Sequence, residues 1–261
     1  MTIDFEECQS LLEGSASQLG SNSPTPIPLR PICRELGVCG VRRDRLEGAK
    51  SLLIDAKTKP VIILNTSVGG TGTQSERFTR LERFLIAHEL GHLVLVQCGV
   101  RNPSGTNEYW KMEKLCDAFA RRLLMPEGLV SSLINEMKPT ALERLAATLK
   151  VVRNFSVHWA AAAMRVAGLT NDTVFFRLAK IPEGGFKIVV STHPNERGIG
   201  QLIKPGTSLY ETLEWHCNGL NSPHEIAAEE LEGIRGITGV RSGALHADRL
   251  AVMPRTEVIS A

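Results

Sequence analysis

The residues best suited to chemistry in this chain are His88, Glu89 and His92, which form an H-E-x-x-H motif. On a helix, side chains four residues apart lie on the same face, so the two histidines can both direct an imidazole nitrogen at one metal ion. Glu89 lies beside them and can accept a proton from a water molecule at that ion. The motif therefore predicts metal-assisted hydrolysis, with two neutral nitrogen ligands and a carboxylate base.

A third ligand is expected from Glu113, in the segment 109–126. This segment has the pattern of a second helix that ends before Pro126, because proline cannot continue a helix. Asp117 follows Glu113 by one helical turn, and its carboxylate can accept a hydrogen bond from the free ring N–H of a ligand histidine. An E-x-x-x-D pair alone is equally typical of a solvated helix face, so it is the preceding motif that favours a metal site. Two histidines and a glutamate predict zinc, with manganese as the alternative, because metal availability can override affinity.

Apolar spacing supports two packed helices around these residues. The two histidines continue a stripe at helical spacing that is expected to be buried; its other members are Leu81, Phe84, Leu85 and Leu95. Gly91 costs a helix about 1 kcal/mol relative to alanine, so we expect it to allow close approach of another element. The predicted inner face of the second helix consists of Leu115, Ala118, Phe119, Leu123 and the stem of Arg122.

The motifs resemble a known family over residues 25–135. H-E-L-G-H preceded by R-F-x-x-A, and then E-x-x-C-D-A-F-A-x-x-L-L-M-P, is similar to the ImmA/IrrE family (IrrE/PprI-like) of bacterial zincin-type metallopeptidases. Typical members have Ala-Asn where this chain has Cys116-Asp117. The resemblance implies a gluzincin-like zinc metalloendopeptidase. Its implied substrate is a DNA-binding transcriptional repressor of the XRE or helix-turn-helix type, which is cleaved to derepress a stress, DNA-damage or mobile-element response.

Composition narrows the class of protein. The chain has 261 residues, of which 43% are hydrophobic and 22% charged, and a net charge of +2, so no overall basic field points to nucleic acid. The start of the chain lacks a signal-peptide core, and no apolar run approaches the roughly 18 residues that span a bilayer. The six cysteines show no C-x-x-C spacing. We therefore expect a reduced, cytoplasmic protein without a membrane partner.

The expected fold class is α+β, with a zincin-like domain that contains a small mixed sheet and the H-E-x-x-H helix. Within it we expect a helix over 29–36 that ends at Gly37, and one edge of the sheet as the place where a substrate peptide adds by backbone pairing. The expected strands are 38–42, 51–55 and 61–65. A helix is expected over 4–13, and the stretch 15–28, rich in Ser, Gly, Asn and Pro, is expected to be a flexible connection. The expected domains are the N-terminal helix and connection in 1–24, the zincin-like domain in 25–137, a helix-turn-helix-like segment in 138–171, and a small α+β domain in 172–261.

Two loops flank the predicted metal helix. The glycine-rich stretch 68–75 lacks the Gly-Lys-Ser/Thr ending of a phosphate-binding loop, so a mobile loop is expected, with Arg77, Arg80 and Arg83 after it on a solvated face. The polar loop 97–110 is expected to border the cleft. Tyr109 and Arg101 are candidates there for stabilising an oxyanion, but a role at the rim is favoured, and neither belongs to the predicted catalytic set.

Helices over 139–150 and 156–169 resemble the helix-turn-helix that often follows the peptidase in this family. Ser156 is the expected N-cap and Gly168 the expected C-cap of the second helix. The predicted connection is longer than the usual three or four residues, and only His158 and Arg165 are suited to reading base edges. Packing or docking of a protein substrate is therefore favoured over direct DNA binding.

The C-terminal block is predicted to contain a hairpin over 174–181 and 185–191, a helix over 225–234 and a last strand over 249–253. Its arrangement resembles IrrE-type regulators, whose C-terminal piece is a GAF-like sensor domain. Four histidines and a cysteine in this block match no standard metal-site spacing; they are His193, His216, His224, His246 and Cys217.

Two alternative functions stay open at this level. One is a non-proteolytic regulator that binds DNA or a repressor, in which the metal only stabilises the fold. The other is a protease without a sensor, whose C-terminal block only docks the substrate. Glu89 argues against the first alternative, because a structural metal site has no need of a base.

Overall fold

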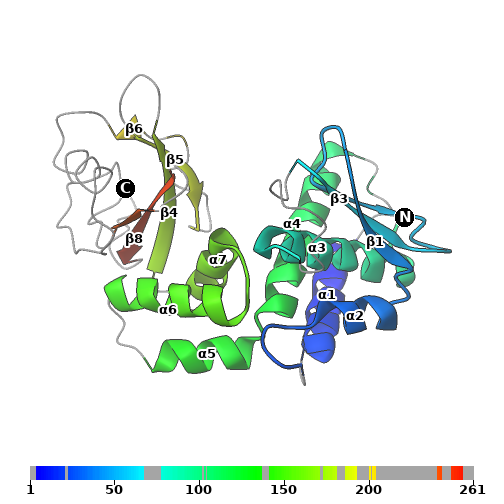
Figure 1. Cartoon of the computed structure of the whole chain (residues 1–261), viewed down its shortest axis with the longest axis horizontal. Coiled ribbons are helices and arrows are strands. Elements are labelled where there is room, and N and C mark those ends of the chain that lie inside the picture. Colours follow the sequence, from blue (N-terminus) through cyan, green and yellow to red (C-terminus); the bar gives the residue numbers. More distant parts are fainter. Residues whose placement is uncertain are drawn as a thin grey trace. The chain divides into compact units, whose positions relative to one another are not determined.

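The computed structural model has an α+β fold, as predicted, and divides into two units (Figure 1). The first unit consists of residues 1–130 and 151–162, and the second of 131–150 and 163–261. The structure describes residues 4–20, 23–67, 78–101, 103, 105–136, 141–170, 173–180, 186–192, 200, 202–203, 240–242 and 248–254. Among these residues, no helix is both long and apolar enough to cross a membrane.

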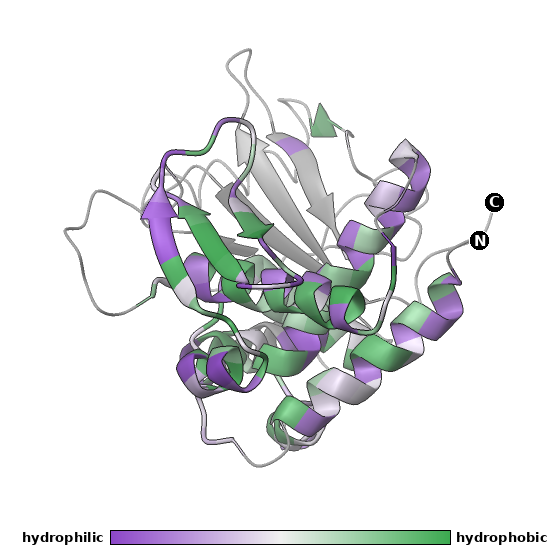
Figure 2. Ribbon diagram, turned by 90° about the vertical axis from the view of Figure 1, so that its right-hand side faces the viewer, coloured by the Kyte–Doolittle hydropathy of each residue, from purple (hydrophilic) through white to green (hydrophobic). Residues whose placement is uncertain are grey.

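A small mixed sheet lies in the first unit. Strands β1 (Gly40–Asp44), β2 (Ser51–Ile54) and β3 (Val61–Asn65) have the order β1-β3-β2, with β1 parallel and β2 antiparallel to β3. The central strand β3 is apolar along nearly its whole length (Figure 2) and is buried at four of its five residues. The three predicted strands and the mixed sheet are confirmed, with β1 shifted two residues toward the C-terminus.

The H-E-x-x-H motif lies in helix α3 (Arg80–Gln97), as predicted. The helix begins with a capping box, in which the Thr79 hydroxyl accepts the N–H of Glu82 and the Glu82 carboxylate accepts the N–H of Thr79. Every residue from Phe84 to Gly91 is buried, so α3 lies inside the core and not along its surface. A helix that is apolar on most faces is stable only when other elements surround it, and here β2, β3, α1, α2 and α4 do so.

Helix α4 (Thr106–Leu124) packs closely on α3 where α3 has Gly91. A Cβ atom at Gly91 would lie 3.1 Å from Cδ1 of Phe119 and 3.3 Å from Cα of Cys116. The predicted close approach is therefore confirmed.

The predicted inner face of α4 is partly wrong. Leu115, Ala118 and Arg122 are only half-buried, because Cys116 and its neighbours along the helix occupy the contact with Gly91. The buried residues of α4 are Met112, Cys116, Phe119, Ala120, Leu123 and Leu124.

Helix α1 (Phe5–Gly20) is much longer than predicted, and the expected flexible connection is wrong for residues 15–20. The helix buries Cys8, Leu12 and Ala16, packs on α4, and has an ion pair of 2.6 Å between Glu13 and Arg122. This burial stabilises a segment whose serines and glycines would otherwise favour a loop.

Helix α2 (Leu29–Glu35) ends as predicted. Gly37 has φ +79° and donates its N–H to the carbonyl of Arg34, while Val38 donates to Cys33, which together form a Schellman motif.

Three further helices follow: α5 (Glu127–Asn135), α6 (Ala141–Asn154) and α7 (Trp159–Thr170). The two predicted helical blocks are confirmed, but their connection, 155–158, is no longer than usual because α6 continues to Asn154. Ser156 is not an N-cap, since it has φ +51°. His158 takes that place, with Nδ1 3.4 Å from the N–H of Ala161, and Gly168 lies inside α7.

His158, one of the two residues suited to reading base edges, makes a packing contact, which agrees with the favoured packing role of this segment. Its ring packs edge-on against Phe84, with centroids 4.7 Å apart, so the side chain belongs to the core around α3.

The second unit contains a five-stranded antiparallel sheet of order β6-β5-β4-β8-β7. The predicted hairpin (β4 with β5) and last strand (β8) are confirmed. The expected helix 225–234, the glycine-rich stretch 68–75, Arg77 and the four histidines with Cys217 lie outside the described residues. The strands are Thr173–Lys180 (β4), Phe186–Ser191 (β5), Leu202–Ile203 (β6), Val240–Ser242 (β7) and Asp248–Pro254 (β8).

A substitution at Gly91 tests the close packing of α3 on α4. Gly91→Leu should lower the free energy of unfolding by about 1–3 kcal/mol, because a larger side chain must push Phe119 and Cys116 away. Gly14→Leu is the matched control: nothing lies within 4 Å of its Cβ position in α1, so helix propensity should leave stability equal or higher. Urea unfolding midpoints measure both, and a Gly91→Leu protein as stable as the control would contradict the packing account.

Candidate metal centre

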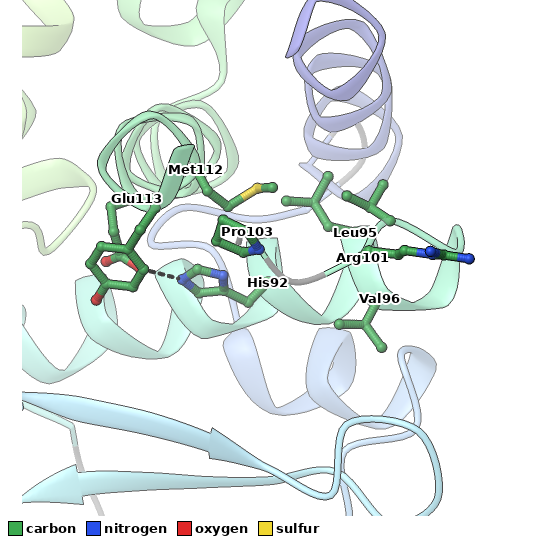
Figure 3. Close-up of a pocket in the computed structure, with 9 residues that line it drawn as sticks. His92, Leu95, Val96, Arg101, Pro103, Met112 and Glu113 are labelled. Carbon is green, nitrogen blue, oxygen red and sulfur yellow. Dashed lines mark ion pairs between the residues drawn. The ribbon is translucent and has the colours of Figure 1, made fainter. Parts of the chain in front are cut away.

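The fold brings three donor atoms together between α3 and α4. His88 Nε2 lies 3.1 Å from His92 Nε2, and these nitrogens lie 3.2 Å from Oε2 and Oε1 of Glu113, respectively. Donors around a tetrahedral zinc ion with bonds of 2.0–2.1 Å are about 3.3 Å apart. The three side chains, a buried histidine and two half-buried partners, therefore have the identity and spacing that fit one such ion. Figure 3 shows Glu113 beside His92, with their ion pair dashed.

Asp117 on α4 contacts the ring of His88. Its Oδ1 is 2.9 Å from Nδ1 of His88. Because a carboxylate only accepts, this contact places a proton on Nδ1 and leaves Nε2 with the lone pair that a metal ion needs. The hydrogen bond therefore fixes both the tautomer and the orientation of the His88 ring.

The charges around His88 favour a cation at this place. Burial lowers the pKa of His88, but hydrogen bonds to Asp117 and Glu113 outweigh burial and raise the pKa to about 9. Burial raises the pKa of Glu113, but its hydrogen bonds with His88 and His92 outweigh that effect and hold the pKa well below its usual range. A metal ion would take the place of the proton in this arrangement, because ligand histidines bind in the neutral form.

The side chain of Glu89 leaves α3 toward β2, about 100° around the helix from that of His88. Glu89 is 6% exposed, and its Oε1 accepts a 2.6 Å hydrogen bond from Oγ of Ser51 on β2. The sequence did not single out Ser51, because 38 residues separate it from Glu89 and no motif links them.

An apolar pocket of about 320 Å³ adjoins the candidate centre (Figure 3). His92, Glu113 and Tyr109 lie at its metal-site end, and Tyr109 belongs to α4, since the predicted loop 97–110 is limited to residues 98–105. Burial and the hydrogen-bonded Glu113 raise the pKa of Tyr109. The remaining lining residues are Leu95, Val96, Val100, Arg101, Pro103 and Met112.

The predicted solvated face after the glycine-rich stretch is wrong for Arg83. Arg83 donates from Nη2 to the carbonyl of Ile27 at 2.8 Å and from Nε to that of Ser156 at 3.2 Å. It therefore joins three distant segments of the first unit. Arg80 is exposed, as expected.

The chain is similar to a known protein family and to a solved structure. Residues 41–165 match the peptidase family model described as the IrrE N-terminal-like domain, and this range includes all five predicted site residues. A solved structure, a Mycobacterium tuberculosis transcriptional regulator, is similar in fold, with 13% identity, a TM-score of 0.58 and coverage of 98% of this chain and 97% of that one. No curated protein matches the chain.

Removal of single carboxylates tests the ligand set. Glu113→Ala should lower the zinc content of the purified protein, because it removes one of three protein ligands. Asp117→Ala should keep the ligands but weaken zinc binding about 10- to 100-fold, since it frees the His88 ring. Zinc is measured by elemental analysis and by competition with a chelator. Glu6→Ala, an exposed change on α1, is the control, and full zinc content in Glu113→Ala would show that another carboxylate is the ligand.

Proposed function

Because residues 41–165 belong to the ImmA/IrrE family, we propose that this chain is a metal-dependent endopeptidase that cleaves a DNA-binding repressor of the helix-turn-helix type. The observation that carries the proposal is the meeting of His88, His92 and Glu113 at distances of 3.1–3.2 Å, with the carboxylate of Glu89 on the same helix. A structural metal site has no use for such a carboxylate, whereas hydrolysis needs a base.

Each side chain has a distinct role in the proposed reaction. His88, His92 and Glu113 would hold the ion, and zinc is preferred over manganese for two imidazoles and a carboxylate. When bound, the ion supplies Lewis-acid polarisation of the peptide carbonyl and lowers the pKa of a water molecule. Glu89 accepts the proton of that water and passes it to the nitrogen of the departing amine. Asp117 keeps the proton of His88 on Nδ1, away from the ion.

The substrate would bind as an extended strand. Among the described strands, β2 lies at an edge of the small sheet, pairs only with β3, and carries the residue that contacts Glu89. A peptide that pairs with the open side of β2 would be aligned by its backbone, and the apolar pocket beside His92 would receive one of its side chains.

A folded repressor offers an extended segment at a linker or a frayed helix end. We therefore propose one cut, or very few, between the DNA-binding and dimerisation parts of the repressor. Loss of the dimer removes the second half-site and most of the affinity for the operator.

The wider setting follows from the same resemblance. The protein would act in the cytoplasm and derepress genes of a stress, DNA-damage or mobile-element response, and its C-terminal unit would be a GAF-like sensor. The alternative is a non-proteolytic metal-stabilised regulator. Its only support is that the protein of similar fold is a transcriptional regulator, and that protein shares just 13% identity with this chain.

Substitution of the base is the central test. Glu89→Gln should keep the fold and the zinc content but reduce cleavage by about 10²- to 10⁴-fold, because an amide cannot accept the proton. The assay incubates the zinc-loaded full chain with the helix-turn-helix repressor encoded nearest its gene and identifies the products by mass spectrometry.

Two controls separate the outcomes of this assay. Glu113→Ala should lose both zinc and cleavage, and Glu6→Ala neither. Undiminished cleavage by Glu89→Gln would refute the role of the base. Many dispersed cuts would refute site-specific cleavage of the repressor, and no cut despite bound zinc would favour the non-proteolytic alternative.

A further inference from the structure

We infer that Ser51 is a positioning residue, which holds the carboxylate of Glu89 in the orientation for proton transfer; this inference rests on the proposed function. The hydrogen bond from Ser51 Oγ to Glu89 Oε1 is 2.6 Å long, within the range of strong O–H···O⁻ bonds. Ser51 is half-buried and Glu89 is 6% exposed, so water competes little for this contact.

The fold places Ser51 by a second set of hydrogen bonds. Asn65, one of the few buried polar residues, donates from Nδ2 to the carbonyls of Leu46 and Ala49, each at 2.7 Å. The N–H of Asn65 donates to the carbonyl of Lys50 at 2.9 Å. The chain just before Ser51 is thereby bound to the end of β3, and Ser51 itself pairs with Leu64 in the sheet. Because the backbone at Ser51 is held by these bonds, the position from which its hydroxyl donates to Glu89 is held as well.

The geometry leaves Glu89 one oxygen for chemistry. Adjacent helix residues point about 100° apart, so the side chain of Glu89 leaves α3 in a different direction from that of His88 and is free to choose among rotamers unless something holds it. Ser51 engages Oε1. Oε2 accepts no hydrogen bond from the described residues and remains for the water molecule. Holding the carboxylate beforehand lowers the entropic cost of reaching the reactive arrangement.

Ser51 also connects the base to the substrate strand. It is the first residue of β2, the edge strand proposed to pair with the peptide. The backbone of this residue helps to align the scissile bond, while its side chain aligns the group that moves the proton. Strand β2 would thus set the distance between the scissile bond and the carboxylate of Glu89.

A purely structural role makes a different prediction. If Ser51 only satisfied a buried carboxylate, loss of its hydroxyl would lower stability or zinc content and would affect cleavage only through them. A positioning role lowers kcat while the Michaelis constant, the zinc content and the melting midpoint stay nearly constant.

The experiment compares Ser51→Thr with Ser51→Val, two β-branched side chains of the same shape that suit a strand and differ in the hydroxyl. Ser51→Thr should keep kcat within about threefold of wild type. Ser51→Val should lower kcat by about 10- to 100-fold, the loss expected for a hydrogen bond to a charged group, with the Michaelis constant within about twofold. Ser51→Ala repeats the test in case the larger side chains do not fit. Ser17→Ala is the control, because that exposed serine also makes one hydrogen bond, of 2.9 Å to the carbonyl of Glu13 on α1.

The readouts are kcat and the Michaelis constant for the repressor that wild type cleaves, zinc content, and thermal midpoint of the full chain. In the Glu89→Gln background, Ser51→Val should cause no further loss, because both changes act on one carboxylate. Normal kcat in both Ser51→Val and Ser51→Ala, beside an inactive Glu89→Gln, would overturn this inference and leave the proposed function intact. A further loss in the Glu89→Gln background would also overturn it. Failure of wild type to cleave any repressor would overturn the proposed function and this inference together.

Discussion

The contact between α3 and α4 at Gly91 is the constraint on which the candidate centre depends. Gly91 lies between the two histidines of the motif, and Cys116 lies between Glu113 and Asp117 on the facing helix. Cys116 Cα and Cβ both come within 3.3 Å of the place where a side chain at Gly91 would begin. This close approach brings the carboxylate of Glu113 on α4 within reach of the ring nitrogens on α3, and it offsets the weakening of the helix by glycine.

The electrostatics of the centre follow from the same contact. Glu113 and Asp117 approach His88 from α4, and together they outweigh the burial that would otherwise keep its ring neutral. Two carboxylates and two imidazoles packed at 2.9–3.2 Å are stable together only with a positive charge among them, whether a proton or a metal ion supplies it. His88, His92 and Glu113 could therefore hold a cation, and the metal affinity of such a site would fall as protons compete at lower pH.

Sequence patterns predicted the elements that carry this site, because their signals are local. The motif helix follows from apolar spacing, the strands from short apolar runs, and the end of α2 from one glycine. The errors concern contacts between distant segments. Contacts with distant segments determine that α1 extends to Gly20 and that Cys116 is buried on the inner face of α4. They also determine that Arg83 donates hydrogen bonds to the carbonyls of Ile27 and Ser156. No periodicity encodes such partners, and the same holds for Ser51, whose hydrogen bond to Glu89 is visible only once β2 lies against α3.

The pair Cys116-Asp117, where this chain departs from the usual family pattern, shows how neighbouring residues on one helix can serve opposite purposes. Cys116 is fully buried against Gly91, and burial raises the pKa of its thiol, so it remains a protonated packing residue and not a ligand. Asp117 points to the other side, is half-buried, and reaches His88. An asparagine there presents an acceptor or a donor, depending on its flip, whereas an aspartate only accepts. The carboxylate therefore specifies one tautomer of His88, and that tautomer is the one that leaves Nε2 facing His92 and Glu113.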